Sequence, residues 1–341
     1  NLFKRNSNYQ ITVFEKNHSI DLNEGYGIQL SVNSIKLLNE IGFKRLEENK
    51  KFYPEKIDFY YKNKIQKICE LEISKFNLED CRYTTLKRSV LINFLKKDLA
   101  DYIKTGRNIC KIDQQEKKIK LTFDNGEASD FDYLVISDGV FSKSKSLVFD
   151  NQIKPKYNNT LAIRGILKKK PEHINCKNIS LSLNSNFHYV IYPVNSKRDL
   201  NFIAIIKYKL SIEEQGNYML FSKESFIEKV LKKFPGYTKE IFDNLGSIKI
   251  FPVFVSQNFY ELKKYNIHMI GDAFFAFSPS FAQGASQSIE GAYELFKNIE
   301  NKTEKNFFDY RRNKTRMINN RSKFNQFAFH LRNPIAVFFR N

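Results

Sequence analysis

Hydrophobic and polar positions along the first third of the chain follow two different periods. Apolar residues recur at helical spacing in SVNSIKLLNEIG (31–42) and LKRSVLINFLKKDLADYI (86–103), which predicts two amphipathic helices. Gly42 follows the first of these runs, as is typical of a helix stop. Between them, short alternating runs from 51 to 73 predict a hairpin.

The middle of the chain is rich in strand patterns. Residues 109–139 predict two strands joined by polar turns, with Asn125-Gly126 as a hairpin signal, and then a buried strand that ends in Asp138-Gly139. The runs TLAIRGIL, ISLSL, HYVIYPV and LNFIAIIKY, from about 160 to 207, predict an antiparallel sheet. A helix at 224–234 and a strand at 247–255 follow, and the region after Gln283 is mainly helical. This order predicts an α/β unit that is interrupted by a mainly antiparallel unit and resumes near Ile267.

Composition places the chain among globular proteins. It has 341 residues, of which 42% are hydrophobic and 27% charged, enough to bury a sizeable core. No apolar run approaches the roughly 18–20 residues of a membrane span, and the first residues do not have the pattern of a signal peptide. The four cysteines are far apart and form no CxxC motif. These features favour reduced thiols, a cytoplasmic location and no structural metal.

The net charge of +19 raises the question of nucleic-acid binding. Lysines outnumber arginines and are scattered along the chain, and tryptophan is absent. Nucleic-acid-binding proteins usually gather Arg and aromatic residues on one face. We therefore predict a solvated basic surface and no nucleic-acid partner, with an electrostatic preference for anionic small molecules or lipid surfaces.

Two segments carry the strongest chemical signals. In GDAFFAFSPSFAQGASQSIEGAYEL (271–295), an apolar strand ends on Asp272 and a helix then opens near Gly284. A buried acid is costly unless it accepts hydrogen bonds, so the segment suggests a ligand with hydroxyl groups and a flat polar ring. The strand in YQITVFEK (9–16) ends on Glu15, where dinucleotide-binding folds place an acid on a ribose. The simpler alternatives are a capped helix with a turn, and an exposed acid after a strand.

Together with Arg88 and DYLVISDGVFSKSK (132–145), these segments resemble, in order and spacing, the group A flavoprotein monooxygenases. These are aromatic hydroxylases related to para-hydroxybenzoate hydroxylase, salicylate hydroxylase and the ubiquinone-biosynthesis hydroxylases. The resemblance implies an α/β fold in which a Rossmann-like FAD-binding domain (1–157 and 262–341) is interrupted by a mainly antiparallel substrate domain with helices (158–261). Part of 50–80 is expected on the substrate side. We expect the family's first strand and GxGxxG loop upstream of residue 1, because NLFKRNSN resembles the end of the helix that follows that loop.

The resemblance also implies which residues contact the cofactor. They come from separate segments and are Glu15, Arg88, Asp138, Gly139, Asp272, Pro279, Gly284 and Ala285. Asp272 would bind a ribityl hydroxyl, Gly284 and Ala285 would present backbone N–H groups to the flavin ring, and Pro279 would line the ring. Glu15 would bind the ribose and Arg88 would face the phosphates. Asp138 and Gly139 match a motif linked to both FAD and NAD(P)H.

The implied reaction is NAD(P)H-dependent hydroxylation of an aromatic, phenolic or related small molecule through a flavin hydroperoxide. The chain departs from the family at Lys145, where an arginine is usual, and at Phe275, where many relatives have a histidine. No catalytic base is assigned. Candidates for the far wall of the pocket are Arg164, His188, Tyr189 and Tyr192, for which core packing is the simpler interpretation.

Other interpretations stay open. One is an FAD-dependent reductase or another non-oxygenase flavoprotein of the same fold, and another is a degenerate basic surface-binding protein. A halogenase is disfavoured because its characteristic motif contains tryptophan. The segment QFAFHLRNPIAVFFRN (326–341) is compatible with peripheral contact to an anionic membrane. We favour packing on the FAD-binding domain, which would partly bury Phe327, Phe329 and Leu331, because Pro334 interrupts any helix there. The sequence makes no prediction of the oligomeric state.

Overall fold

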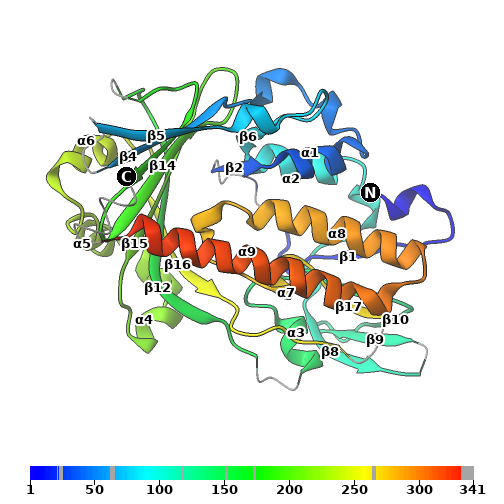
Figure 1. Cartoon of the computed structure of the whole chain (residues 1–341). Coiled ribbons are helices and arrows are strands. Elements are labelled where there is room, and N and C mark those ends of the chain that lie inside the picture. The colour runs from blue at the N-terminus through cyan, green and yellow to red at the C-terminus, as the bar shows by residue number, and fades with distance from the viewer. Residues whose placement is uncertain are drawn as a thin grey trace.

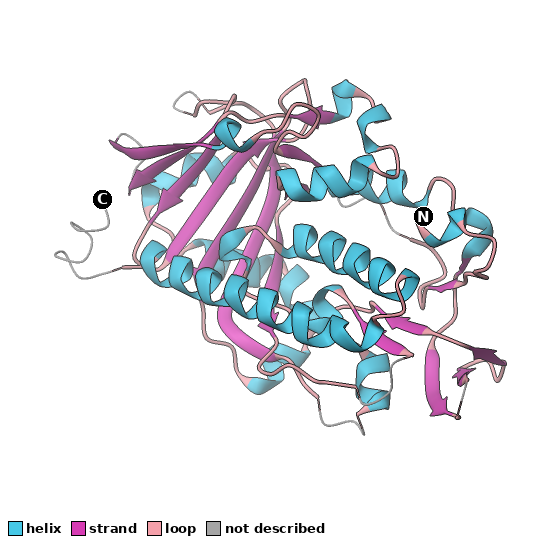
Figure 2. Cartoon of the chain, turned by 45° about the vertical axis from the view of Figure 1, so that its right-hand side comes forward, coloured by secondary structure: helices cyan, strands magenta, loops and turns pink. Residues whose placement is uncertain are grey.

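The largest element of the computed structural model is a seven-stranded sheet, seen as one layer in Figure 2. The structure describes residues 1–20, 22, 26–61, 66–116, 118–149, 153–171, 174–262 and 266–331. The strands are, in sheet order, β16 (Lys249–Val255), β12 (Lys156–Leu167), β15 (Leu200–Lys207), β14 (Phe187–Pro193), β13 (Ile179–Leu183), β4 (Lys56–Tyr61) and β5 (Gln66–Glu72). Neighbours run antiparallel except β13 and β4, which are parallel. The hairpin predicted between 51 and 73 is formed by β4 and β5, and it extends this sheet.

The main core lies against this sheet because its strands carry near-continuous apolar runs. Ile163, Phe202 and Ile206 are almost fully buried and pack with the helical segments that follow β15. The packed helices are α5 (Glu224–Leu231) and α6 (Lys239–Asp243), whereas α4 (Ile212–Gly216), which precedes them, buries none of its residues. The antiparallel sheet predicted from about 160 to 207 is confirmed in pairing.

A second layer combines helices with a small sheet. The sheet has the order β2 (Gly27–Leu30), β6 (Thr84–Lys87), β3 (Lys51–Phe52). Its helices are α1 (Val32–Asn39), α2 (Arg88–Lys96) and α8 (Gly284–Glu300), and their apolar sides share one core with Leu30 and Leu86. The helix predicted over 86–103 is wrong at both ends: residues up to Lys87 form a strand because they pair with β2, and the helix stops at Lys96.

Two short parallel strand pairs lie on a common core. β1 (Val13–Phe14) pairs with β7 (Ile103–Lys104), and β11 (Leu134–Ile136) pairs with β17 (Ile267–Met269). Phe14 packs in the same cluster as Ile136 and Met269. The strand before Asp138 was predicted to be buried, but only Ile136 of β11 is, since within the described residues β11 has a neighbour on one edge alone.

One further sheet and three further helices belong to the fold. They are the antiparallel sheet of β8 (Ile109–Gln114), β9 (Ile119–Phe123) and β10 (Ala128–Phe131), and the helices α3 (Lys143–Val148), α7 (Gly271–Phe274) and α9 (Phe307–Phe329). The predicted Asn125-Gly126 turn joins β9 to β10, with Gly126 at φ +83°. Figure 1 shows α9 lying across the outside of the molecule alongside α8. Within the part of the chain that the structure describes, none of the helices has the length and apolarity to cross a membrane.

Candidate functional site

The segment from β17 to α8 makes two tight turns that only certain residues allow. Gly271 follows β17 at φ +58°, a backbone conformation that side chains with a Cβ rarely adopt. A short helical turn at Pro279–Phe281 ends on Ala282, which has φ 51°. A left-handed alanine costs free energy and is found mostly where the surrounding structure has a functional reason to hold it.

Asp272 lies between these turns without a partner. Its side chain reaches solvent, yet the surrounding protein desolvates the carboxylate and raises its pKa above the ordinary value. Among the described residues, the carboxylate makes neither a hydrogen bond nor an ion pair. An exposed but desolvated acid indicates the wall of a concave site, where a donor from a ligand would relieve the cost.

The N-terminus of α8 next to Asp272 is open. Gln283 precedes the helix, no side chain caps it, and its first turn has no acidic residue. A Cβ added at Gly284 would meet no atom within 4 Å. The first N–H groups of a helix need acceptors and favour negative charge, so this end of α8 offers donors to a ligand.

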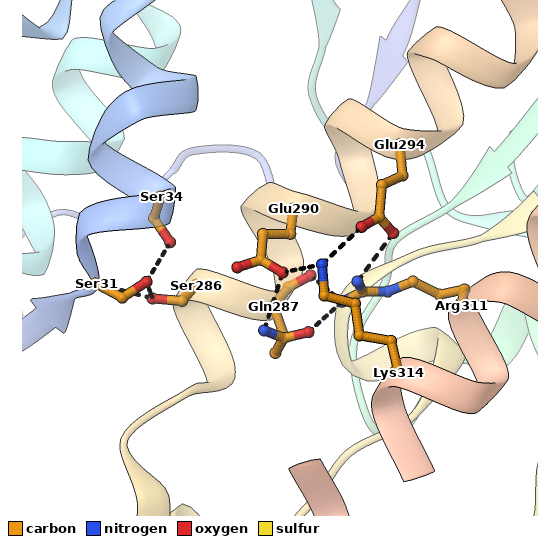
Figure 3. Close-up of polar contacts among 8 residues, drawn as sticks. All are labelled: Ser31, Ser34, Ser286, Gln287, Glu290, Glu294, Arg311 and Lys314. Carbon is orange, nitrogen blue, oxygen red and sulfur yellow. Dashed lines mark hydrogen bonds and ion pairs between the residues drawn. The ribbon is translucent and has the colours of Figure 1, made fainter. Parts of the chain in front are cut away.

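Three serines hold α8 to α1 (Figure 3). The Ser31 backbone N–H donates to Ser286 Oγ at 3.2 Å, and the Ser31 hydroxyl lies 3.3 Å from the same oxygen. Ser31 Oγ is also 3.1 Å from Ser34 Oγ, and both Ser34 and Ser286 are fully buried. The first turn of α8 is therefore fixed from the α1 side.

A charged network fixes the same turn from the α9 side (Figure 3). The buried Arg311 donates from Nη2 to the backbone oxygen of Gln287 at 2.6 Å and to its Oε1 at 2.8 Å. Its Nη1 bonds Glu294 at 3.0 Å. Lys314 bridges Glu290 at 2.8 Å and Glu294 at 3.0 Å, so two cations balance two carboxylates. This close approach of the helices needs Gly291, because a Cβ there would lie 3.1 Å from Arg311 Nε.

The network and Asp272 meet at a cavity of about 10 Å³. Its lining includes Asp272, Gly284, Gln287, Arg311 and Thr315. The cavity has room for about one water molecule. The buried Thr315 hydroxyl has no partner among the described groups, and a water in the cavity would satisfy it.

The other predicted cofactor residues lie on separate elements. Glu15 Oε1 accepts the Asn17 N–H at 2.8 Å. Arg88 is exposed at the start of α2. Asp138 Oδ2 accepts the Ser144 N–H at 3.0 Å, and Gly139 follows at φ +84°.

The structure thus brings Asp272 and Gly284 together at one cavity. Pro279 opens the short helical turn before α8, and Ala285 packs partly into the core beneath α8. Among the described contacts, no hydrogen bond or ion pair connects Glu15, Arg88 or Asp138 with the cavity beside Asp272.

The two positions that depart from the family are both buried. Lys145 lies with its Nζ 4.8 Å from the centre of the Tyr260 ring, and burial lowers its pKa to about 8. Phe275 stacks on Phe259 with ring centres 4.3 Å apart. Phe275 therefore belongs to the core in this chain.

The four candidates for the far wall lie in the large sheet. Tyr189 is buried and stacks near Phe202, while His188 Nδ1 lies 2.9 Å from His330 Nε2. Arg164 lies with its guanidinium 5.6 Å from the Tyr26 ring. Tyr192 is also buried, and burial raises its pKa.

Several tertiary contacts were missed from the sequence. They involve Asn201, whose Oδ1 accepts the Gly27 N–H at 2.6 Å, and the network residues Gln287, Glu290, Glu294, Arg311 and Lys314. The four-residue spacing of Glu290 and Glu294 and the three-residue spacing of Arg311 and Lys314 place each pair on one helix face. That spacing was the only hint of the network in the sequence, and it does not predict that these faces of α8 and α9 contact each other.

Comparison with known proteins gives relatives in sequence and in structure. The chain is 24% identical over 219 residues to a flavin-dependent monooxygenase of an unknown prokaryotic organism, which covers 61% of this chain and 54% of that protein. It is 21% identical over 293 residues to the 6-hydroxynicotinate 3-monooxygenase of Bordetella bronchiseptica. This match covers 81% of this chain and 73% of that protein. The fold matches HpxO of Klebsiella pneumoniae, complexed with FAD and uric acid, at a TM-score of 0.80 and 13% identity, over 96% of this chain and 84% of that one. Both sequence relatives are thus named monooxygenases, and the first is named flavin-dependent.

The family resemblance predicted from the sequence is thereby confirmed, and so is the predicted fold class. The chain spans about half the length, 54%, of the first relative that it matches. No family model matches the chain. The domain boundaries predicted from the sequence stay a prediction.

Proposed function

We propose that this protein is an FAD-dependent monooxygenase that consumes NAD(P)H and hydroxylates an aromatic, phenolic or related small molecule. The observation that carries the proposal is Asp272, a desolvated carboxylate without a partner in the described residues, beside the uncapped N-terminus of α8. These groups fit FAD, because a ribityl hydroxyl would donate to the carboxylate and the α8 N–H groups would donate to the flavin ring edge.

When bound, FAD supplies the redox and oxygen chemistry. The chain's own residues bind and orient it. Gly284 leaves open space for a ring to approach the backbone, and the contacts Ser31–Ser286 and Arg311–Gln287 hold the first turn of α8 from two sides. A binding group that is fixed before the ligand arrives costs little conformational entropy on binding.

The remaining cofactor residues complete this proposal. Arg88 is exposed and has no ion-pair partner in the described residues, so its guanidinium is available to a phosphate. Glu15 would bind the ribose, and Asp138 with Gly139 would contact FAD or NAD(P)H. Pro279 would line the ring, with Ala285 as a second N–H donor. We also propose the division into a FAD-binding domain (1–157 and 262–341) and a substrate domain (158–261).

An aromatic substrate has support from the relatives. One of them is named for 6-hydroxynicotinate, and another is bound to uric acid. In this chain the large sheet meets β2 where Arg164 lies against the Tyr26 ring, and the Gly27 N–H bonds Asn201. A cation and aromatic rings at this junction suit a small anionic aromatic molecule.

Protein expressed from the full coding sequence provides the test. We expect a yellow protein with a flavin absorption spectrum, whose NAD(P)H oxidation a phenolic acid accelerates. Labelled O₂ should deliver one oxygen atom to the product. Accelerated NAD(P)H oxidation without label in the product would indicate a reductase, and a colourless protein that does not bind added FAD would indicate a degenerate basic protein.

A further inference from the structure

The outer face of α9 carries a line of exposed large apolar residues. Tyr310, Met317 and Phe324 are seven residues apart, so they lie above one another on one side of the helix. Their exposed fractions are 56%, 48% and 69%, and Phe327 beside them is 68% exposed. We call these four residues the apolar line. The partial burial predicted from the sequence is therefore wrong for Phe327, which lies on the exposed side of α9, and confirmed for Phe329 and Leu331. The opposite side of α9 is buried through Arg311, Thr315, Ile318 and Ser322.

Basic residues flank the apolar line on both sides. From Tyr310 to Leu331 the sequence has six Lys and Arg residues and no Asp or Glu. Arg311 and Lys314 are neutralised by α8, and Arg312 pairs with Asp309 at 2.7 Å. Arg321 on one flank, and Arg316 with Lys323 on the other, are exposed and have no carboxylate partner among the described residues.

The shape of this surface suits a flat partner. α9 has 23 residues, a length of about 34 Å. Figures 1 and 2 both show it as an outermost element, alongside α8. An outer helix of this length can lie along a flat surface.

We propose that the outer face of α9 docks on a membrane surface with anionic headgroups. The apolar line would enter the boundary between headgroups and acyl chains, and Arg316, Arg321 and Lys323 would contact lipid phosphates, as in interfacial amphipathic helices. A second copy is a poorer occupant, because a two-fold contact would set these unpaired cations against one another.

A tryptophan probe tests the contact directly, because the chain has no tryptophan. Phe324→Trp places the probe on the apolar line, and Phe76→Trp is the matched control, since Phe76 is 65% exposed and lies outside α9. With phosphatidylcholine–phosphatidylserine vesicles, we expect a blue shift of emission from Phe324→Trp alone. No shift would overturn the proposal, and so would equal shifts from both probes, which would mean general adsorption of a basic protein. A shift that grows with protein concentration without vesicles would also overturn it in favour of a second copy.

Charge variants provide the second arm. Replacing both Arg321 and Lys323 by Gln should lower the partition into anionic vesicles about 30-fold, and the Lys232→Gln, Lys233→Gln pair, which follows α5 and lies outside α9, should lower it much less. All four residues are exposed, so the variants should fold. Equal losses in both pairs, or binding to pure phosphatidylcholine that matches binding to the anionic vesicles, would overturn the proposal.

Discussion

The guanidinium of Arg311 donates two hydrogen bonds from one nitrogen to Gln287, at 2.6 Å to the backbone oxygen and at 2.8 Å to the side-chain oxygen. A long C-terminal helix thereby fixes the first turn of the helix whose open N-terminus lies beside Asp272. The contact links a buried charge network to the proposed cofactor site, so the network is expected to matter for both stability and binding.

Arg311→Met should destabilise the protein strongly. Removing one partner of a buried charge network costs roughly 3–5 kcal/mol, since Glu294 and the Gln287 oxygens keep their burial and lose their donor. Urea denaturation measures the change. Arg312→Met is the matched control, because its pair with Asp309 lies at the surface, and it should cost about 0–1 kcal/mol. Equal losses from the two variants would contradict the role of Arg311.

Asp272→Asn should stabilise the FAD-free protein at neutral pH. Desolvation raises the Asp272 pKa, so the folded protein keeps the proton to a higher pH than the unfolded chain does. The free energy of unfolding of the wild type therefore falls as pH rises from the Asp272 pKa of the unfolded chain to that of the folded protein. Above the folded pKa the full cost of burying the charged carboxylate is present. Denaturation from pH 3 to pH 7 should show the variant gaining on the wild type.

Asp272→Ala should weaken FAD binding in the full-length protein. A charge-assisted hydrogen bond contributes roughly 1.5–3 kcal/mol, which corresponds to about one to two decades of affinity. Titration of the cofactor-free protein with FAD, followed by flavin fluorescence, gives the dissociation constant. Unchanged affinity with an intact fold would remove the main support for the proposed flavin site.

The His188–His330 pair should make stability depend on acid. Burial lowers the His188 pKa to about 3, so between pH 3 and the ordinary value of 6.5 the unfolded chain binds a proton that the folded one excludes. Stability is then complete above pH 6.5 and falls as pH decreases, by up to about 1.4 kcal/mol per pH unit for one proton. His188→Gln should flatten this part of the profile. A profile as steep as that of the wild type would refute the assignment.

Gly27→Ala should disrupt the contact between β2 and the large sheet. A Cβ at Gly27 would lie 2.6 Å from Val194, 2.8 Å from Tyr192 and 2.9 Å from Asn201. Overpacking of this kind typically costs 1–3 kcal/mol, and displacement of the strand would also strain the bond from the Gly27 N–H to Asn201. Thermal unfolding measures the loss. Gly236→Ala, whose Cβ would meet nothing within 4 Å, is the control and should leave the melting temperature nearly unchanged.

The sequence by itself determined many of the local helices, strands and turns, and the order along the chain of the segments that resemble the flavoprotein family. Short apolar runs, alternating or continuous, predicted the strands of the large sheet, because the burial of a strand determines which of its successive residues are apolar. Asn125-Gly126 marked the turn between β9 and β10, and Gly271 lies just after β17; both glycines adopt positive φ angles that few other residues tolerate. The family resemblance extended these local signals to a cofactor.

Only the tertiary structure decided which distant groups meet. Gly27 and Asn201, His188 and His330, and Arg311 and Gln287 are contacts between residues 24 to 174 positions apart, and helical or strand periodicity contains no information about them. Tertiary contacts also determine where α2 begins, since Thr84–Lys87 form a strand by pairing with β2. The sequence predicted a solvated basic surface, yet Arg311 is buried and Lys314 is half-buried, because their carboxylate partners lie on α8 and are brought close by packing around Gly291.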